Sequence, residues 1–163
     1  MEKVAELTGW CAAHAMQIVS ETGKLVPFLV MKKADGPRQF VQLVESSTQM
    51  FEDVVRLLNE MSAPDMRAVM AYDAFLQVED HKTNAIILDG YRLAQPRQSL
   101  KLAIAYAAEA EGRNKFAGAS PRVIEQVATD ISINTIAENF TSGQATHSSF
   151  AKAADPATRK RRV

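Results

Sequence analysis

The chain has 163 residues, of which 47% are hydrophobic and 23% charged, and its 19 basic side chains balance 19 acidic ones. This composition is that of an ordinary globular domain and excludes the disordered, fibrous and membrane-spanning classes. A single cysteine, Cys11, excludes an intramolecular disulfide and a thiolate cluster. We therefore expect one domain that builds its core without a covalent or metal cross-link.

The amino-terminal residues mix charged with apolar side chains, unlike the uninterrupted apolar segment of a secretory signal. The longest apolar runs, at 25–31 and 85–88, are far shorter than the roughly 18 residues that a membrane span requires. We expect a soluble, cytoplasmic protein that has no membrane partner.

A helix followed by a β-hairpin is predicted for the first part of the chain. Apolar residues recur at spacings of three and four over 2–21, and Gly23 is a typical helix stop. Residues 25–31 and 40–44 then follow a strand pattern, and an Asp-Gly turn lies between them. Pro27 lacks a backbone donor, which predicts an edge or bulged position for its strand.

A second helix and three strands are predicted next. The helix covers 48–61, and the strands cover 66–78, 85–93 and 100–106. In the first of these strands, even-numbered positions from Ala68 onward form the predicted core face, and Asp73 lies on the outward face. Residues 79–84 form a polar turn.

The carboxyl-terminal part predicts one more helix and a tail. Ser120 and Pro121 resemble an N-cap and a first helical residue, and apolar residues at helical spacing extend the helix to about Asn139. Beyond Thr141 the chain consists mainly of Ser, Gly, Ala and Thr, so we expect it to be loosely ordered. The domain prediction is therefore 1–141, followed by a flexible basic tail at 142–163.

The expected order is helix, two strands, helix, three strands, helix, which predicts an α+β fold with a five-stranded antiparallel sheet covered by helices. This order resembles that of roadblock-type and profilin-like domains and is close to that of type III secretion chaperones. The resemblance concerns element order and not a sequence motif. It implies protein binding and dimerisation as expectations.

One group of acidic residues could hold a metal ion. Asp73, Glu79 and Asp80, together with Lys82, are the residue types that a metal-dependent nuclease or phosphodiesterase uses to hold Mg²⁺ and to stabilise charge. However, Asp73 and Glu79 are six positions apart, which corresponds to about 20 Å along a straight strand. The alternative interpretation is a solvated turn with one outward acid.

The remaining chemical candidates are weaker. Cys11 and His14 lie three residues apart on the first predicted helix and could form a thiol and imidazole pair, but Cys11 belongs to the apolar stripe. His14, His81 and His147 lack the short spacing of zinc ligands, and no glycine-rich phosphate loop occurs. We therefore expect no bound cofactor.

A basic run near the carboxyl terminus could contact nucleic acid or an acidic partner. It consists of Arg159, Lys160, Arg161 and Arg162.

Two functional hypotheses remain. The first is a non-catalytic protein-binding domain of the adaptor type, which forms a homodimer through a sheet edge or a helix face. The second is a small metal-dependent nuclease or phosphodiesterase that uses Asp73, Glu79 or Asp80, and Lys82.

Overall fold

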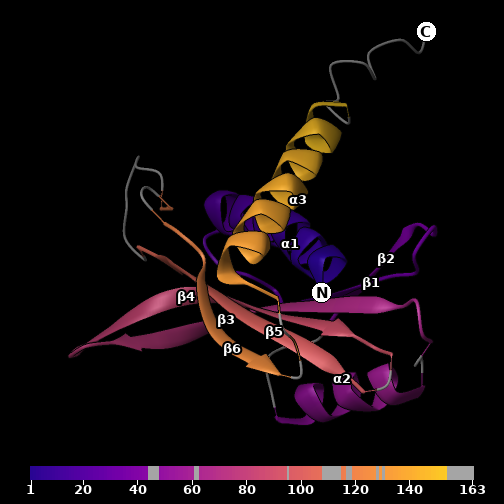
Figure 1. Cartoon of the computed structure of the whole chain (residues 1–163). Helices are drawn as coiled ribbons and strands as arrows, with labels where there is room; N and C mark the ends of the chain where they lie inside the picture. The colour runs from indigo at the N-terminus through magenta and orange to yellow at the C-terminus, as the bar shows by residue number, and fades with distance from the viewer. Residues whose placement is uncertain are drawn as a thin grey trace, which may run out of the picture.

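The computed structural model has three helices and an open six-stranded antiparallel sheet, which confirms the α+β class (Figure 1). The structure describes residues 1–43, 48–60, 63–94, 96–107, 115–116, 119–127, 129 and 131–153, with only the backbone at 78 and 148–153. The elements are α1 (Glu2–Thr22), β1 (Phe28–Lys32), β2 (Arg38–Gln42), α2 (Thr48–Glu60), β3 (Arg67–Val78), β4 (His81–Arg92), β5 (Gln98–Tyr106), β6 (Arg122–Val127) and α3 (Ile133–Ala153).

The strands lie in the order β2-β1-β3-β4-β5-β6, so β2 and β6 form the two edges. Figure 1 shows α1 and α3 on one face of the sheet and α2 on the opposite face. In the described part of the chain, no helix has the length and apolarity needed to cross a membrane.

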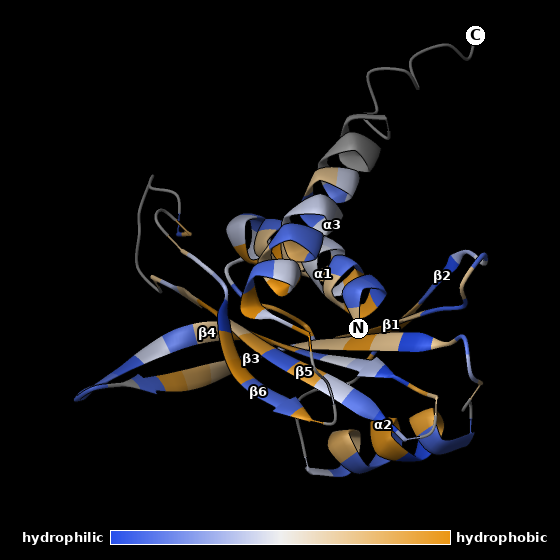
Figure 2. Ribbon diagram, in the orientation of Figure 1, coloured by the Kyte–Doolittle hydropathy of each residue, from blue (hydrophilic) through white to orange (hydrophobic). Residues whose placement is uncertain are grey.

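The larger core lies between α1 and the sheet. Cys11, Ala15 and Val19 on α1 are fully buried and belong to one cluster with Val30 of β1 and Val69 of β3. The helix ends at the predicted stop, where Gly23 adopts a left-handed φ of 84°. In Figure 2, orange segments of the strands and of α1 mark the apolar residues of this layer.

The smaller core lies under α2. Met50, Val54 and Leu58 repeat at a spacing of four, which places them on one side of the helix. They belong to one cluster with Met70 of β3 and with Leu93, the residue after β4. The prediction of a single core face on β3 is therefore incomplete. Ala68 and Met70 face α2, whereas Val69 and Ala71 face α1, and all four are buried.

The predicted hairpin is confirmed, but its edge strand is not the one expected. β1 pairs with both β2 and β3, so it is an interior strand. Pro27 lies one residue before β1, where its missing donor breaks no pairing inside the strand, and its carbonyl accepts a hydrogen bond from Leu43 N. The edge strand is β2.

The prediction of five strands is wrong, because residues 122–127 form a sixth strand, β6, and not the first turns of a helix. Val123 and Val127 fit a helical spacing but are β-branched, and β5 offers a free edge with which they pair. The last helix begins only at Ile133, where Ser132 Oγ accepts a hydrogen bond from Thr135 N.

The expectation of a loosely ordered chain beyond Thr141 is also corrected, because α3 continues to Ala153. The boundary predicted between 141 and 142 thus falls inside a helix. Helix α3 is held by close packing on α1: Gly143 approaches the backbone of Glu6, and Phe140 approaches Gly9. Residues 154–163, including the basic run Arg159, Lys160, Arg161 and Arg162, lie outside the described residues.

Candidate functional site

The outer edge of β2 presents backbone groups that no described strand pairs with. Leu43 N donates a hydrogen bond to Pro27 O. In an antiparallel ladder, hydrogen-bonded residue pairs alternate with pairs that are not hydrogen-bonded. Gln39 and Val41 therefore exchange hydrogen bonds with β1. The N–H and C=O groups of Arg38, Phe40 and Gln42 consequently point away from β1. Such an edge is a template for a further strand.

The two edges of the sheet differ in their regularity. β6 joins β5 with a register shift between Lys101 and Leu102, and an irregularity of this kind twists an edge away from new partners. β2 pairs with β1 in an unbroken register over five residues. Its one charged residue, Arg38, lies over the ring of Trp10 with its guanidinium carbon 4.6 Å from the ring centroid. β2 is therefore the edge better suited to pairing.

An apolar pocket of about 500 Å³ opens beside β2 on the α1 face. It is lined by His14, Ile18, Thr22, Lys24, Val26, Phe28, Phe40 and Gln42. Phe40 stacks on Phe28 with ring centroids 5.0 Å apart, yet 47% of its surface is exposed. A strand that pairs with β2 could therefore place an apolar side chain against Phe40.

Behind Phe40, two histidines from opposite ends of the chain meet. His147 Nε2 on α3 lies 3.3 Å from His14 Nδ1 on α1, and Trp10 stacks on His14. The ring of Phe40 contacts His14 edge to face. Because the two histidines are 133 positions apart in the chain, their spacing in the sequence could not indicate this contact.

We expect acid to weaken the docking of α3 on α1. Burial lowers the pKa of both imidazoles; for His147 the neighbouring charges of His14 and Arg38 add to this, whereas Glu21 opposes it at His14. Below pH 6.5, the ordinary pKa of histidine, the unfolded chain therefore binds more protons than the folded protein does. The free energy of unfolding is consequently largest above this pH and decreases below it.

Chemical denaturation between pH 7.5 and 5.5 measures this effect. A double variant, His14→Gln with His147→Gln, should show a smaller decrease than the parent protein. His81→Gln, which changes an exposed residue at the start of β4, should keep the decrease of the parent. An equal decrease in the double variant would contradict the expectation.

The structure separates the acids of the predicted metal site. Glu79 and Asp80 form the exposed two-residue turn between β3 and β4, and Lys82 lies on β4 opposite Gln77. Asp73 lies in the middle of β3, opposite Ile86 and away from the turn. Among the described residues, no three His, Cys, Asp or Glu side chains are placed to hold a metal ion.

Asp73 has a structural role instead. Its carboxylate accepts a hydrogen bond from Leu25 N at 2.8 Å and another from the Tyr106 hydroxyl at 2.9 Å. It thus ties the connection between α1 and β1 to β5, on the α1 face of the sheet. The predicted outward position of Asp73 is wrong, because this end of the α1 face is covered by the connection before Phe28.

The structure does not favour a reactive thiol at Cys11. The side chain is fully buried, and burial raises the pKa of its thiol. His14 Nδ1 lies within hydrogen-bonding distance of His147. Cys11 therefore packs as a small apolar residue.

One acidic side chain, Asp89, is buried on the α2 face of the sheet. Asp89 has 6% of its surface exposed, and burial raises the pKa of its carboxyl group, while Lys101 and Tyr72 oppose the shift. Tyr72 donates a hydrogen bond to Asp89 at 3.2 Å, and Lys101 Nζ lies 3.5 Å from the carboxylate. These contacts offset part of the cost of burying the carboxylate, and in the described part of the chain its Oδ1 atom accepts no hydrogen bond.

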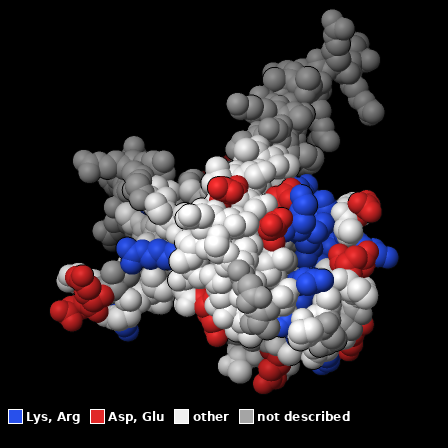
Figure 3. All heavy atoms as spheres, viewed as in Figure 1, with Lys and Arg blue, Asp and Glu red and all other residues white. Residues whose placement is uncertain are grey.

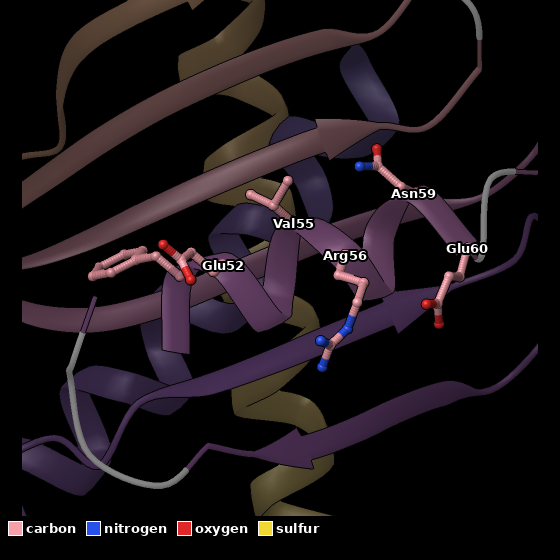
Figure 4. A pocket seen from close by; sticks show the side chains of 6 residues that line it. Glu52, Val55, Arg56, Asn59 and Glu60 are labelled. Carbon is pink, nitrogen blue, oxygen red and sulfur yellow. The ribbon is translucent and has the colours of Figure 1, made fainter. Parts of the chain in front are cut away.

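The outer side of α2 has a shallow depression of about 620 Å³ (Figure 4). Its lining residues are Phe51, Glu52, Val55, Arg56, Asn59 and Glu60. All of them come from one helix, so no second element forms an opposing wall. A small ligand here would bury little of its surface, unlike a ligand in a typical binding pocket.

Searches with protein-family models, curated proteins and solved structures found no significant match to this chain. The candidate site therefore rests on its own geometry. The sequence pattern predicts the hairpin but not the position of β2 at the sheet edge, because strand order depends on long-range pairing.

Proposed function

We propose that the chain is a non-catalytic protein-binding domain of the adaptor type, and that its partner at β2 is a second copy of the same chain. One observation carries the proposal: the regular outer edge of β2 presents the backbone groups of Arg38, Phe40 and Gln42 beside an exposed apolar ring. Backbone groups on a regular edge provide affinity, and the adjoining side chains provide register.

The charges of β2 favour an antiparallel, two-fold arrangement. Centred on Phe40, this arrangement places Arg38 opposite Gln42 of the second copy and the two Phe40 rings on the same face. A parallel arrangement would place two Arg38 residues beside each other, and like charges at this distance repel. Cross-strand aromatic pairs add roughly 0.5–1.5 kcal/mol to the strand pairing.

The expected dimer is weak and dynamic. β2 has only five residues, and paired strands of this length bury less than the roughly 1,200 Å² of a standard interface. We therefore expect a dissociation constant of roughly 10 µM.

Sedimentation velocity over a range of concentrations tests the proposal with proline substitutions. Gln42→Pro removes an outward N–H and should yield a monomer that melts close to the parent temperature. Gln42→Ala keeps this N–H and should still dimerise. Gln39→Pro removes an inward N–H, so it should lower the free energy of unfolding by about 1–3 kcal/mol.

A parent protein that stays monomeric at concentrations well above 100 µM would overturn the homodimer. A dimer that persists in Gln42→Pro would place the interface elsewhere, on a helix face or at β6. Either result would remove β2 as the site of self-association.

A further inference from the structure

Four basic residues lie side by side across four neighbouring strands at one end of the sheet. The register places Arg38 of β2 opposite Lys32 of β1, Lys32 opposite Arg67 of β3, and Arg67 opposite Arg92 of β4. Residues that are directly opposite share one face of the sheet, which here is the α1 face. We call Arg38, Lys32, Arg67 and Arg92 the cationic row.

The cationic row costs stability in the unliganded protein. Like charges directly opposite each other in a sheet repel, and the row contains three such neighbouring pairs in succession. Within the described residues, none of the ion pairs involves the row: the acid partners belong to Lys3, Arg56 and Lys101. A repulsive arrangement of this kind is typical of a binding site and not of a scaffold.

The hydrogen bonds of the row leave its charges uncompensated. Arg67 donates to the backbone carbonyl of Ala34, and Arg92 donates to the side-chain carbonyl of Gln98, so both partners are neutral. The Nε atom of Arg38 is buried without a hydrogen-bond partner in the described part of the chain. The Arg38 guanidinium also lies over the ring of Trp10. The row therefore keeps a net positive charge, and Arg67 and Arg92 keep donors that these hydrogen bonds do not use.

Two adjoining hollows lie over the row. The larger, of about 810 Å³, is lined by Arg67 and Arg92, and the smaller, of about 230 Å³, by Lys32, Arg38 and Arg67. Lys3 of α1 lines both. Acidic residues also line the hollows, namely Glu2, Glu6, Asp35 and Asp65, but none of them stands in the row. Figure 3 shows blue spheres gathered over the amino-terminal end of α1 and the β1–β2 hairpin, with red spheres around them.

We propose that the cationic row is a binding site for the phosphate chain of a small ligand, either a nucleoside triphosphate or inorganic polyphosphate. Strands about 4.8 Å apart spread the four charges over about 14 Å, which suits a linear chain of phosphates. Arginine binds phosphate oxygens in a bidentate manner and stays charged at every physiological pH. The larger hollow leaves room for a group attached to the chain.

Both α1 and α3 begin at the larger hollow, which is lined by Glu2 and Lys3 at one helix start and by Ser132 and Thr135 at the other. The positive ends of two helix dipoles therefore add to the field of the row. The hollow lies between helix ends and the sheet, so a linear phosphate chain fits it better than a nucleic-acid duplex does.

Isothermal titration of the protein with sodium tripolyphosphate tests the site. The parent should bind, and the double variant Arg67→Gln with Arg92→Gln should bind at least about tenfold more weakly. Arg122→Gln removes the same charge from β6, distant from the row, and should bind like the parent. Gln42→Pro should also bind like the parent, because the site does not depend on pairing of β2.

The melting temperatures without ligand separate binding from a structural role. Removal of the repulsion should leave the double variant as stable as the parent or more stable. A lower melting temperature, absence of binding by the parent, or an equal loss in Arg122→Gln would overturn the proposal. Equal affinities for ATP and tripolyphosphate would identify the phosphate chain as the ligand, whereas tighter binding of ATP would identify a nucleotide.

Discussion

Replacement of Gly143 by alanine is expected to lower the free energy of unfolding by about 3 kcal/mol or more. A methyl group on Gly143 would overlap the Glu6 carbonyl oxygen on α1. The obstructing atom belongs to a helix backbone, so no rotation of a side chain can relieve the clash. α3 would have to move away from α1.

Gly9 provides the reciprocal test, because a methyl group there would meet the backbone carbonyl of Phe140 on α3. Urea denaturation of Gly143→Ala and Gly9→Ala measures both effects. Gly36→Ala is the matched control: its new methyl would lie 3.4 Å from Lys33 Cβ, and its effect should stay within about 1 kcal/mol. If Gly143→Ala and Gly9→Ala were both as stable as the parent protein, the close crossing of α1 and α3 would be contradicted.

Replacement of Asp73 by alanine is expected to cost about 2–3 kcal/mol of the free energy of unfolding. The change removes the acceptor of Leu25 N and of the Tyr106 hydroxyl at the same time. Leu25 is buried, so its N–H would lose its partner in a place that water reaches poorly. Denaturant titration measures the loss.

Two companion variants locate the origin of this loss. Tyr106→Phe removes one of the two hydrogen bonds and should cost about half as much. Asp80→Ala changes the exposed β3–β4 turn and should stay within about 0.5 kcal/mol of the parent. A melting temperature that rises with Mn²⁺ in the parent but not in Asp73→Ala would contradict the structural role and favour a metal site.

The local patterns of the chain predicted most of the secondary structure. The apolar spacing of α1 and the Gly23 stop, the β1–β2 hairpin and the amphipathic pattern of α2 all depend on near neighbours in the sequence. The assignment failed at Val123, Ile124 and Val127, whose spacing suits a helix and whose side chains suit a strand. Pairing with β5 decides between the two, and the sequence pattern does not contain this pairing.

The prediction for the carboxyl-terminal helix was wrong for a different reason. Ser, Gly and Thr after Thr141 are weak helix formers, which predicted a loose tail. In the structure, Gly143 is required because α1 lies so close, and His147 contacts His14. Tertiary packing therefore stabilises a helix that local propensity does not favour.

The two proposed sites depend on sheet order. Arg38, Phe40 and Gln42 become an open edge only because β1, and not β2, pairs with β3. The cationic row requires four strands in one register, and its members are scattered between positions 32 and 92. Cross-strand placement of this kind follows from the fold and leaves no spacing motif in the sequence.

Amide hydrogen exchange along β2, measured by NMR at low and high protein concentration, tests pairing through this edge most directly. In dilute protein, the amides of Gln39 and Val41 should exchange slowly, and those of Arg38, Phe40 and Gln42 rapidly. At high concentration, the outward amides should become protected while the inward ones change little. Outward amides that exchange equally fast at both concentrations would contradict the account.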